Sequence, residues 1–295
     1  MPEPDKALPM TRDRSARIWL DRFFGLIGAL AAVISLLLFL WLIRDLVRLG
    51  LPHLSWGFLT GEVEDAGRSG GIGPLLVSSL WILACCLAVV IPLGTGCALW
   101  LSEFVRRGSL GARLVTGGVD LLASVPSIVF GLFGMVFFAQ TLGLGFSILS
   151  GGLTLACMIL PILVRTTLTA LESLPADLRP AAAALGLTKT TATAKILLPA
   201  ALPGIVVGIT LGIGRALSET AALLFTSGYS TRLPESISDS GRALSVHIYD
   251  LALNVANGGP MASASALVLL ALIFVVNSAA VALSEHWLRR RQSFS

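Results

Sequence analysis

The chain has 295 residues, of which 55% are hydrophobic and 13% are charged, and its formal net charge is +4. Soluble domains carry roughly 25% charged residues, so this composition excludes a soluble protein and indicates an integral membrane protein. The apolar runs are about 20 residues long, and a bilayer holds no water to satisfy backbone groups, so the spans are expected to be helices rather than barrel strands. The predicted fold class is all-α, a polytopic membrane protein.

Six apolar segments are long enough to cross a bilayer as helices. They are about Phe23–Ile43, Pro74–Leu101, Val119–Gln140, Ile148–Val164, Leu198–Phe225 and Ala262–Leu283. The first segment follows a basic, polar stretch, exceeds the length of a signal-peptide core and ends without a small-residue cleavage pattern. We therefore expect six transmembrane helices, the first of them retained.

The distribution of Lys and Arg predicts that both termini are cytoplasmic, because positive charge is retained on that side of a membrane. With the amino terminus inside, 15 of the 21 basic residues lie in inner segments, five lie in outer segments, and Arg215 lies within a span. The net charge therefore reflects membrane topology. A nucleic-acid partner, which would need a basic face on a soluble fold, is not expected.

A proline interrupts the third apolar segment. Pro126 stands among small residues at positions 123–131. Proline inside a helix leaves a carbonyl that neighbouring groups or water must satisfy, so this helix is expected to be kinked. The kink would either line a pathway or serve packing against another helix. Asp120, near the cytoplasmic start of the segment, is expected at the membrane interface.

No metal site, disulfide or cofactor is indicated. The outer loop at residues 227–261 is expected to include a short helix within Ala243–Ala256, on which His247 and Asp250 would be surface residues or contact a partner. The four cysteines all fall inside apolar runs, which favours packing roles. They are Cys85, Cys86, Cys97 and Cys157.

A polar break between Arg165 and Lys195 separates the fourth and fifth apolar segments. Apolar and small residues recur in this break at helical spacing, and Gly186 follows them as a terminator. The recurring residues are Leu171, Leu174, Leu178, Ala182 and Leu185. We expect a short helix with an alanine-rich surface, which could fit closely into a groove on a partner.

The fifth span carries two charged residues, Arg215 and Glu219. Residues four apart lie on the same side of a helix, close enough for an ion pair. Charges in a bilayer are costly and generally face the bundle interior or mark a pathway. Two interpretations remain open: a mutually neutralising structural pair, or an arginine beside the path of an anion with the glutamate balancing it. Gly204, Gly208 and Gly212 recur every four residues before them, which allows close approach of another helix.

The spacing within the polar break resembles the EAA loop in the membrane subunits of ABC importers. The matching residues are Ala181, Ala182, Gly186, Ile196, Leu198 and Pro199, with nine residues between the glycine and the isoleucine. Pro180, preceded by Arg179, replaces the leading glutamate of the motif, which removes any ion pair that the glutamate would make. The resemblance implies a type I ABC importer permease fold, with a coupling helix in a loop at about 165–195 seated in a groove of a cytoplasmic ATPase.

The chain is not expected to be an enzyme. Gly186–Thr190 has a superficial similarity to a phosphate-binding loop, but no glycine precedes Lys189, and the spacing that the loop requires is missing. ATP hydrolysis is therefore expected on a separate partner chain.

A narrower resemblance is to the A-type membrane subunits of the Pst phosphate importers. It is carried by Val125–Gly131, Val164–Thr167 and Arg215–Thr226, with Ser218 where the family commonly has glycine. It implies a phosphate permease of the bacterial inner membrane that forms a heterodimer with a homologous second permease subunit, and that assembles with two copies of an ATPase and an extracytoplasmic phosphate-binding protein. The expected organisation is a tail at 1–22, a first span with an outer connector at 23–70, the permease domain at 71–286 and a second tail at 287–295.

Phosphate chemistry suits this resemblance. Phosphate is a hydrated dianion near neutral pH, and a guanidinium can bind two of its oxygens at once, so Arg215 is the candidate within the path. Arg165, at the inner end of the fourth span, would either meet the ion near its exit or anchor the positive-inside topology. The alternatives are the same machinery for sulfate, molybdate or a phosphonate, and an ion-coupled secondary transporter in which Glu219 exchanges protons.

Overall fold

The computed structural model describes residues 14–106 and 108–292, and it divides into two compact units between Arg48 and Leu49. The first unit consists of α1 (Arg14–Gly50) up to that boundary. Its apolar side chains from Phe23 to Leu42 are all exposed. A helix of this length and composition is suited to cross a bilayer, which confirms the first predicted span.

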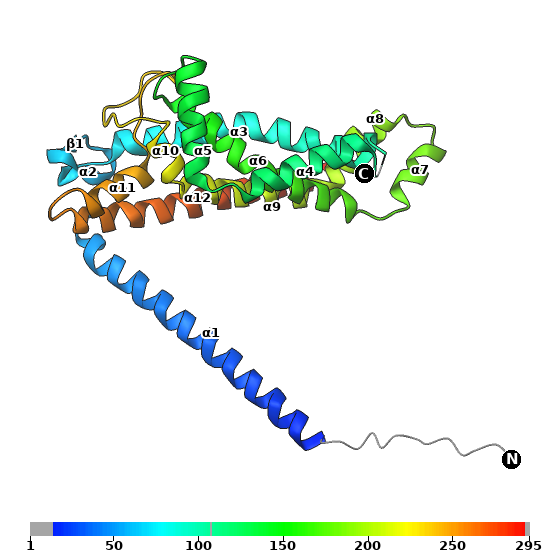
Figure 1. The fold of residues 1–295 in the computed structure, drawn as a ribbon, viewed down its shortest axis with the longest axis horizontal. Helices are drawn as coiled ribbons and strands as arrows, with labels where there is room; N and C mark the ends of the chain where they lie inside the picture. Colours follow the sequence, from blue (N-terminus) through cyan, green and yellow to red (C-terminus); the bar gives the residue numbers. More distant parts are fainter. Residues whose placement is uncertain (1–13, 107, 293–295) are drawn as a thin grey trace. The chain divides into compact units, whose positions relative to one another are not determined.

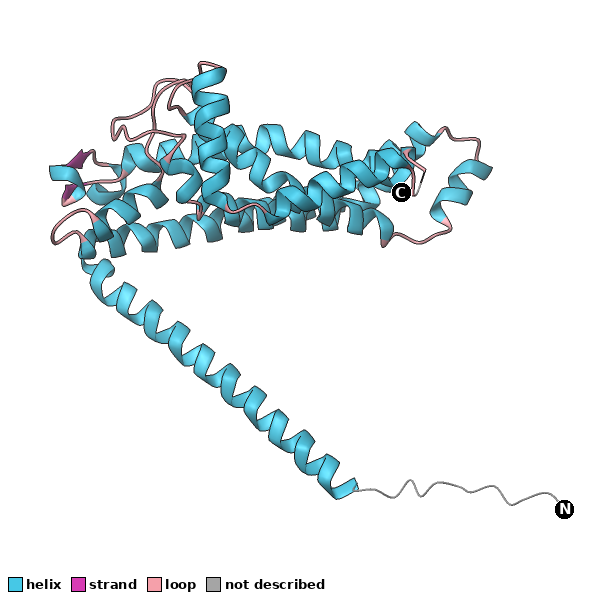
Figure 2. Ribbon diagram, viewed as in Figure 1, coloured by secondary structure: helices cyan, strands magenta, loops and turns pink. Residues whose placement is uncertain are grey.

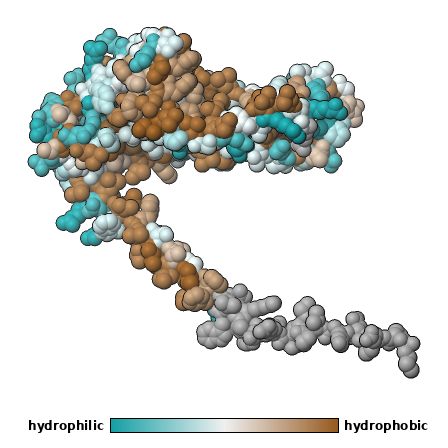
Figure 3. Space-filling view, viewed as in Figure 1, coloured by the Kyte–Doolittle hydropathy of each residue, from teal (hydrophilic) through white to brown (hydrophobic). Residues whose placement is uncertain are grey.

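Four long helices form the body of the second unit: α3 (Gly73–Leu99), α6 (Ile148–Glu172), α9 (Leu198–Leu217) and α12 (Gly259–Gln292). They run lengthwise beside one another, α3 against α6, α6 against α9 and α9 against α12 (Figure 1). The main core lies between them, and a space-filling view shows hydrophobic side chains gathered over the middle of this unit (Figure 3). An apolar belt between more polar ends is the surface that a bilayer requires.

The glycines of α9 allow α6 to approach closely. A Cβ atom added at Gly204 would lie 2.4 Å from the Cβ of Ala170, and one at Gly208 would lie 2.0 Å from Oγ1 of Thr166. One at Gly212 would lie 2.8 Å from a methyl carbon of Ile159. The four-residue glycine spacing therefore predicted this helix contact correctly.

The third predicted span is sharply bent. It consists of α4 (Leu110–Ser124), α5 (Ser127–Gly134) and the π-helical segment η4 (Met135–Thr141). The chain bends by 104° between α4 and the helix formed by α5 and η4. Val125 and Pro126 between them have extended backbone angles. A residue before proline avoids the helical region, which explains why the chain turns there. The predicted kink is confirmed, and the described residues hold five helices able to cross a membrane, or six if the bent pair counts as one span.

One end of the second unit, called here the α11 end, carries short elements. They are η1 (Leu51–His53), α2 (Trp56–Thr60), β1 (Val63–Glu64), η2 (Asp65–Gly67), β2 (Ser69–Gly70) and α11 (Leu244–Leu253). The antiparallel pair β1–β2 is the small strand pair visible in Figure 2, with Val63 opposite Gly70. The α11 helix packs on α12 and confirms the short helix predicted within Ala243–Ala256.

His247 on α11 is buried, with 1% of its surface exposed, so the prediction of a surface residue was wrong. Its imidazole packs against Gly67, where an added Cβ atom would lie 2.5 Å from the ring carbon Cε1. Gly67 also has a φ of +93°, which favours glycine. Sequence periodicity did not reveal this contact because it joins η2 to α11, two elements far apart in the chain.

The opposite end, called here the α7 end, carries α7 (Leu178–Ala184), α8 (Lys189–Ala192) and two π-helical segments, η3 (Trp100–Phe104) and η5 (Thr193–Leu197). The α6 helix continues past Arg165 to Glu172, so the polar break begins two turns later than predicted. Leu171 and Leu174 therefore do not share a helix with Ala182, contrary to the prediction.

Gly186 terminates α7, as predicted. Its φ is +72°, its N–H donates to the carbonyl of Ala183 at 2.9 Å, and the N–H of Leu187 donates to the carbonyl of Ala182 at 3.1 Å. This pair of bonds is the Schellman arrangement, which needs a left-handed residue after the last helical turn.

Candidate functional site

The α9 helix ends at Leu217, before Glu219 is reached. The prediction that Arg215 and Glu219 lie four residues apart on one helix was therefore wrong, and no ion pair joins them among the described residues. The chain turns at Ser218 and starts the short helix α10 (Ala221–Leu224). The two charges thus belong to different local structures.

Glu219 has a structural role at the start of α10. Its carboxylate accepts a hydrogen bond from the backbone N–H of Ala222 at 3.3 Å, and its residue surface is 8% exposed. The hydroxyl of Ser245 donates to the backbone carbonyl of Glu219 at 2.6 Å. A carboxylate at a helix N-terminus satisfies a backbone donor that has no partner within the helix.

Arg215 lies in the last turn of α9 and is exposed. Its Nη2 atom lies 3.9 Å from the sulfur of Met158 on α6, and no carboxylate among the described residues pairs with it. An arginine in an apolar span needs a polar surrounding or an anion, since an unpaired charge in hydrocarbon costs at least a few kcal/mol. Its positive charge is therefore available to a ligand or a partner.

Arg165 forms an ion pair with Asp120, which joins α6 to α4. About half of each side chain is exposed, 56% for the arginine and 49% for the aspartate. Met158 and Arg165 are two helical turns apart on α6 and hence on one face, separated by about 10 Å along the helix axis. The guanidinium of Arg215, which approaches Met158 from α9, and Arg165 therefore lie beside the same face of α6. Arg165 already has a carboxylate partner.

The six residues of the coupling motif fall in two groups. Ala181 and Ala182 lie in α7, Gly186 follows it, Ile196 lies in η5, and Leu198 and Pro199 begin α9. Within α7, Ala182 faces inward at 3% exposure. Ala181 is exposed, and Leu185 is 76% exposed directly after the helix. The outward side of α7 is thus a small-residue surface with one large apolar side chain.

A recess of about 490 Å³ separates α7 from the π-helical segments η3 and η5. Its lining includes Ala182 and Leu197 as apolar residues and Glu103, Arg179 and Lys189 as charged ones. The structure therefore brings the inner side of the coupling motif next to a charged cluster that the motif itself does not contain.

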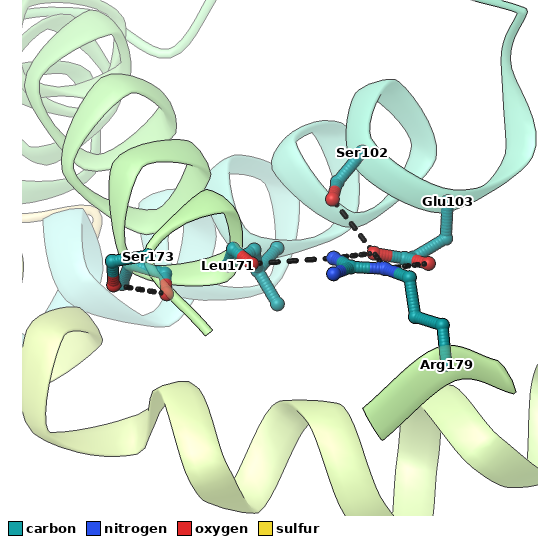
Figure 4. A network of polar contacts seen from close by, with 6 residues as sticks. Ser102, Glu103, Leu171, Ser173 and Arg179 are labelled. Carbon is teal, nitrogen blue, oxygen red and sulfur yellow. Dashed lines mark hydrogen bonds and ion pairs between the residues drawn. The ribbon is translucent and has the colours of Figure 1, made fainter. Parts of the chain in front are cut away.

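Sequence reasoning missed Glu103. This residue lies in η3, directly after α3, and forms an ion pair with Arg179 of α7 at 2.6 Å (Figure 4). One signal was available: a single glutamate interrupts the end of the second apolar run, before Arg106. Its partner could not be chosen from sequence because 76 residues separate the pair.

Among the described residues, no group of three or more His, Cys, Asp or Glu side chains is placed to hold a metal ion. The four cysteines carry free thiols. The candidate site is thus composed of fixed charges and small-residue surfaces.

Comparisons with known proteins agree with this arrangement. Over residues 90–290 the chain matches the family described as binding-protein-dependent transport system inner membrane component. It is 34% identical over 272 residues to the probable ABC transporter permease protein YqgI of Bacillus subtilis, across 85% of this chain and 90% of that protein. It is 35% identical over 205 residues to the phosphate transport system permease protein PstA of Xylella fastidiosa, across 68% of this chain and 70% of that protein.

A solved structure has a similar fold. It is described as a crystal structure of a bacterial ABC transporter involved in the import of the acidic polysaccharide alginate. The TM-score is 0.66 at 18% identity, over 92% of this chain and 99% of that one. At this identity the likeness bears on the fold alone, and it supports a type I importer arrangement of the helices.

Proposed function

The chain belongs to the binding-protein-dependent transport system inner membrane component family, and from this premise we propose that it is the permease subunit of an ATP-driven importer of inorganic phosphate. It is a transport subunit of an ABC transporter and not an enzyme. One observation favours an anion as the substrate: Arg215 has an exposed guanidinium in the last turn of a membrane-spanning helix. This guanidinium has no carboxylate partner among the described residues.

Arg215 would bind the ion within the path, and Arg165 would meet it nearer to the α7 end. Met158, which Arg215 approaches from α9, and Arg165 lie about 10 Å apart along one face of α6, so an anion released from the first arginine would meet the second nearer to the α7 end. A guanidinium can bind two phosphate oxygens at once in fixed geometry. The Asp120 carboxylate beside Arg165 would weaken the second binding step and so favour release.

Glu219 would act indirectly in this scheme. Because its carboxylate is used at the N-terminus of α10, it shapes the turn that follows Arg215 rather than neutralising the arginine. We therefore propose a positioning role for Glu219 in place of a balancing charge.

The α7 helix would dock on a separate ATPase. Its exposed small residues and the protruding Leu185 form a surface that a groove on a partner could enclose. Ala181, Ala182 and Gly186 would form the docking helix, while Ile196, Leu198 and Pro199 would pass its displacement into α9.

The name of a PstA relative supports phosphate as the substrate. The proposed partners follow from the resemblance of the sequence to the Pst membrane subunits: a homologous second permease subunit in a heterodimer, two copies of an ATPase, and an extracytoplasmic phosphate-binding protein. The setting is the bacterial inner membrane with both termini in the cytoplasm, which would place the α7 end inside and the α11 end outside. Residues 71–286 would form the permease domain, after the tail at 1–22 and the first span with its connector at 23–70, and before the tail at 287–295.

The test is uptake of radiolabelled phosphate by the reconstituted transporter. Arg215→Gln is expected to lower uptake at least tenfold while the complex still assembles, because the neutral amide keeps the side chain polar but loses the bidentate cation. Arg113→Gln, which removes an exposed arginine from the first turn of α4, is the matched control and should leave uptake unchanged. Undiminished transport by Arg215→Gln would reject the assignment of the path.

Two further measurements separate the alternatives. Excess sulfate, molybdate or a phosphonate should not compete with phosphate, and strong competition by one of them would name that anion as the substrate instead. Uptake should stop in ATP-depleted vesicles, whereas uptake that persists there under an imposed proton gradient would indicate a secondary transporter.

A further inference from the structure

Arg179 and Glu103 form a bidentate ion pair at the α7 end. Nη2 of Arg179 lies 2.6 Å from Oε1 of Glu103, and Nε lies 3.2 Å from each carboxylate oxygen (Figure 4). The hydroxyl of Ser102 donates a third bond to Oε1 of the same carboxylate at 2.7 Å. Two nitrogens of one guanidinium on one carboxylate give a bidentate contact, which fixes orientation as well as distance.

The pair is shielded from solvent more than the Arg165–Asp120 pair. The Glu103 side chain is 11% exposed and that of Arg179 is 35% exposed, whereas both partners of the Arg165–Asp120 pair are about half exposed. The Glu103 carboxylate raises the pKa of the Arg179 guanidinium above its ordinary value. Screening by salt and water is correspondingly weaker here than for a surface pair.

Arg179 also connects a third element. Its Nη2 donates to the backbone carbonyl of Leu171 at 3.2 Å, within the last turn of α6. Carbonyls at the end of a helix have no partner within that helix, so the arginine satisfies one of them. One side chain on α7 therefore holds both the end of α6 and the segment that follows α3.

This connection matters because α7 has little other support. Beyond α8, it shares few contacts with the remaining helices, and a turn at residues 173–177 separates it from α6. By contrast, α3 and α6 pack along most of their length and form the most extensive helix pair of the chain. The ion pair thus joins a loosely supported helix to the most rigid part of the bundle.

We propose that the Arg179–Glu103 pair is a second route by which a displacement of α7 reaches the spans, through η3 into α3, beside the covalent route through η5 into α9. This inference rests on the proposed function, in which α7 receives that displacement from an ATPase. Arg179 is a positioning residue. It immediately precedes Pro180, which stands where the motif of the family has glutamate. In this chain the coupling helix is thus joined to Glu103 through an arginine one residue before that position.

The π-helical segments suit such a route. Both η3 and η5 line the recess beneath α7, and each is continuous with a long helix, η3 with α3 and η5 with α9. A π-helical turn has longer hydrogen-bonded loops than an α-helix and often marks a functional position. A displacement of α7, transmitted through Arg179 to Glu103, would therefore act on η3, a deformable turn at the end of α3.

The test uses a double-mutant cycle in the complete reconstituted transporter: Arg179→Gln, Glu103→Gln and the two together. Two quantities are measured, namely phosphate transported per ATP hydrolysed and hydrogen exchange of the backbone amides of residues 178–187. Each single variant is expected to keep ATP hydrolysis, to exchange faster in α7 and to transport roughly tenfold less per ATP, since bonds of this kind contribute about that factor to an equilibrium. The double variant should be no worse than either single one, because the two groups act as a unit.

Arg179→Lys keeps the charge but not the bidentate contact, so it is expected to give intermediate transport per ATP. Arg113→Gln is the matched control: this exposed cation in the first turn of α4 makes no side-chain hydrogen bond or ion pair with the described residues, and both readouts should stay at wild-type values. Additive losses in the double variant, or faster exchange in α7 with unchanged transport per ATP, would overturn the second route while leaving the proposed function intact. A wild-type chain that binds no ATPase would overturn the proposed function itself, whatever the exchange data show.

Discussion

The close contact between α6 and α9 makes Gly208 a position where one added methyl group should destabilise the chain. A Cβ atom there would lie 2.0 Å from Oγ1 of Thr166 and 3.0 Å from its Cβ. Non-bonded heavy atoms prefer separations of about 3.5 Å or more, so the hydroxyl would have to move or the helices to separate. The hydroxyl is not free to move without loss, because it donates to the carbonyl of Ile162 at 2.9 Å and lies 3.2 Å from that of Leu163.

The expected magnitude for Gly208→Ala follows from three terms. Alanine is favoured over glycine inside a helix by about 1 kcal/mol. Overpacking a tight interface costs about 1–3 kcal/mol, and losing the hydroxyl bond costs about 1 kcal/mol more. The net expectation is a destabilisation of about 1–3 kcal/mol, in spite of the improved helix propensity.

The assay is the thermal stability of the purified subunit in detergent, with Gly96→Ala as the matched control. Gly96 is an exposed glycine of α3 whose added Cβ atom would meet nothing within 4 Å, so the control should be neutral or slightly stabilising. Equal unfolding temperatures for the two variants would refute the idea that the glycine stripe, Gly204, Gly208 and Gly212, sets the distance between α6 and α9.

Three further predictions concern other parts of the chain. Burial, assisted by the charge of Arg242, lowers the pKa of His247 from 6.5 to about 4, so the unfolded chain takes up a proton first as the pH falls. The free energy of unfolding should therefore decrease by on the order of 3 kcal/mol between pH 6.5 and about 4. Melting temperatures measured over a pH series should show this loss in the wild-type chain and not in His247→Leu. Leu185→Asp places a charge on a side chain that is 76% exposed, so the subunit should fold normally but co-purify with much less ATPase than Leu185→Ala does. Asp120→Asn frees Arg165 from its half-exposed carboxylate partner; thermal stability should change by less than about 1 kcal/mol, whereas phosphate uptake should slow because the freed cation retains the ion.

The membrane-spanning helices could be predicted from the sequence because each follows from a long local run of apolar residues. The glycine stripe was equally readable, since its period of four is a property of one helix. Helix ends were less predictable. Arg165 and the two threonines after it suggested a polar break, yet α6 continues to Glu172 because the arginine finds Asp120 and the hydroxyl of Thr166 bonds within its own helix.

The candidate site was only partly predictable, and the missing part depends on contacts between distant segments. The end of α9 is stabilised by Ser245, which donates to the Glu219 carbonyl from 26 residues away. The Arg179–Glu103 pair spans 76 residues, and the contact of His247 with Gly67 joins α11 to η2. None of these pairings has a period or a spacing that a single sequence could reveal.

The separation of Arg215 from Glu219 changes what the intramembrane charge implies. Had the two formed an ion pair, the arginine would need nothing further, and a structural role would explain it. Because the carboxylate instead holds the N-terminus of α10, the guanidinium stays exposed beside Met158 without a carboxylate partner among the described residues. An unpaired cation in a span costs at least a few kcal/mol unless water, a partner or an anion compensates it. Where neither water nor a partner compensates the charge, binding of an oxyanion would relieve this cost, and the helix break at Ser218 is what leaves Arg215 without a carboxylate partner among the described residues.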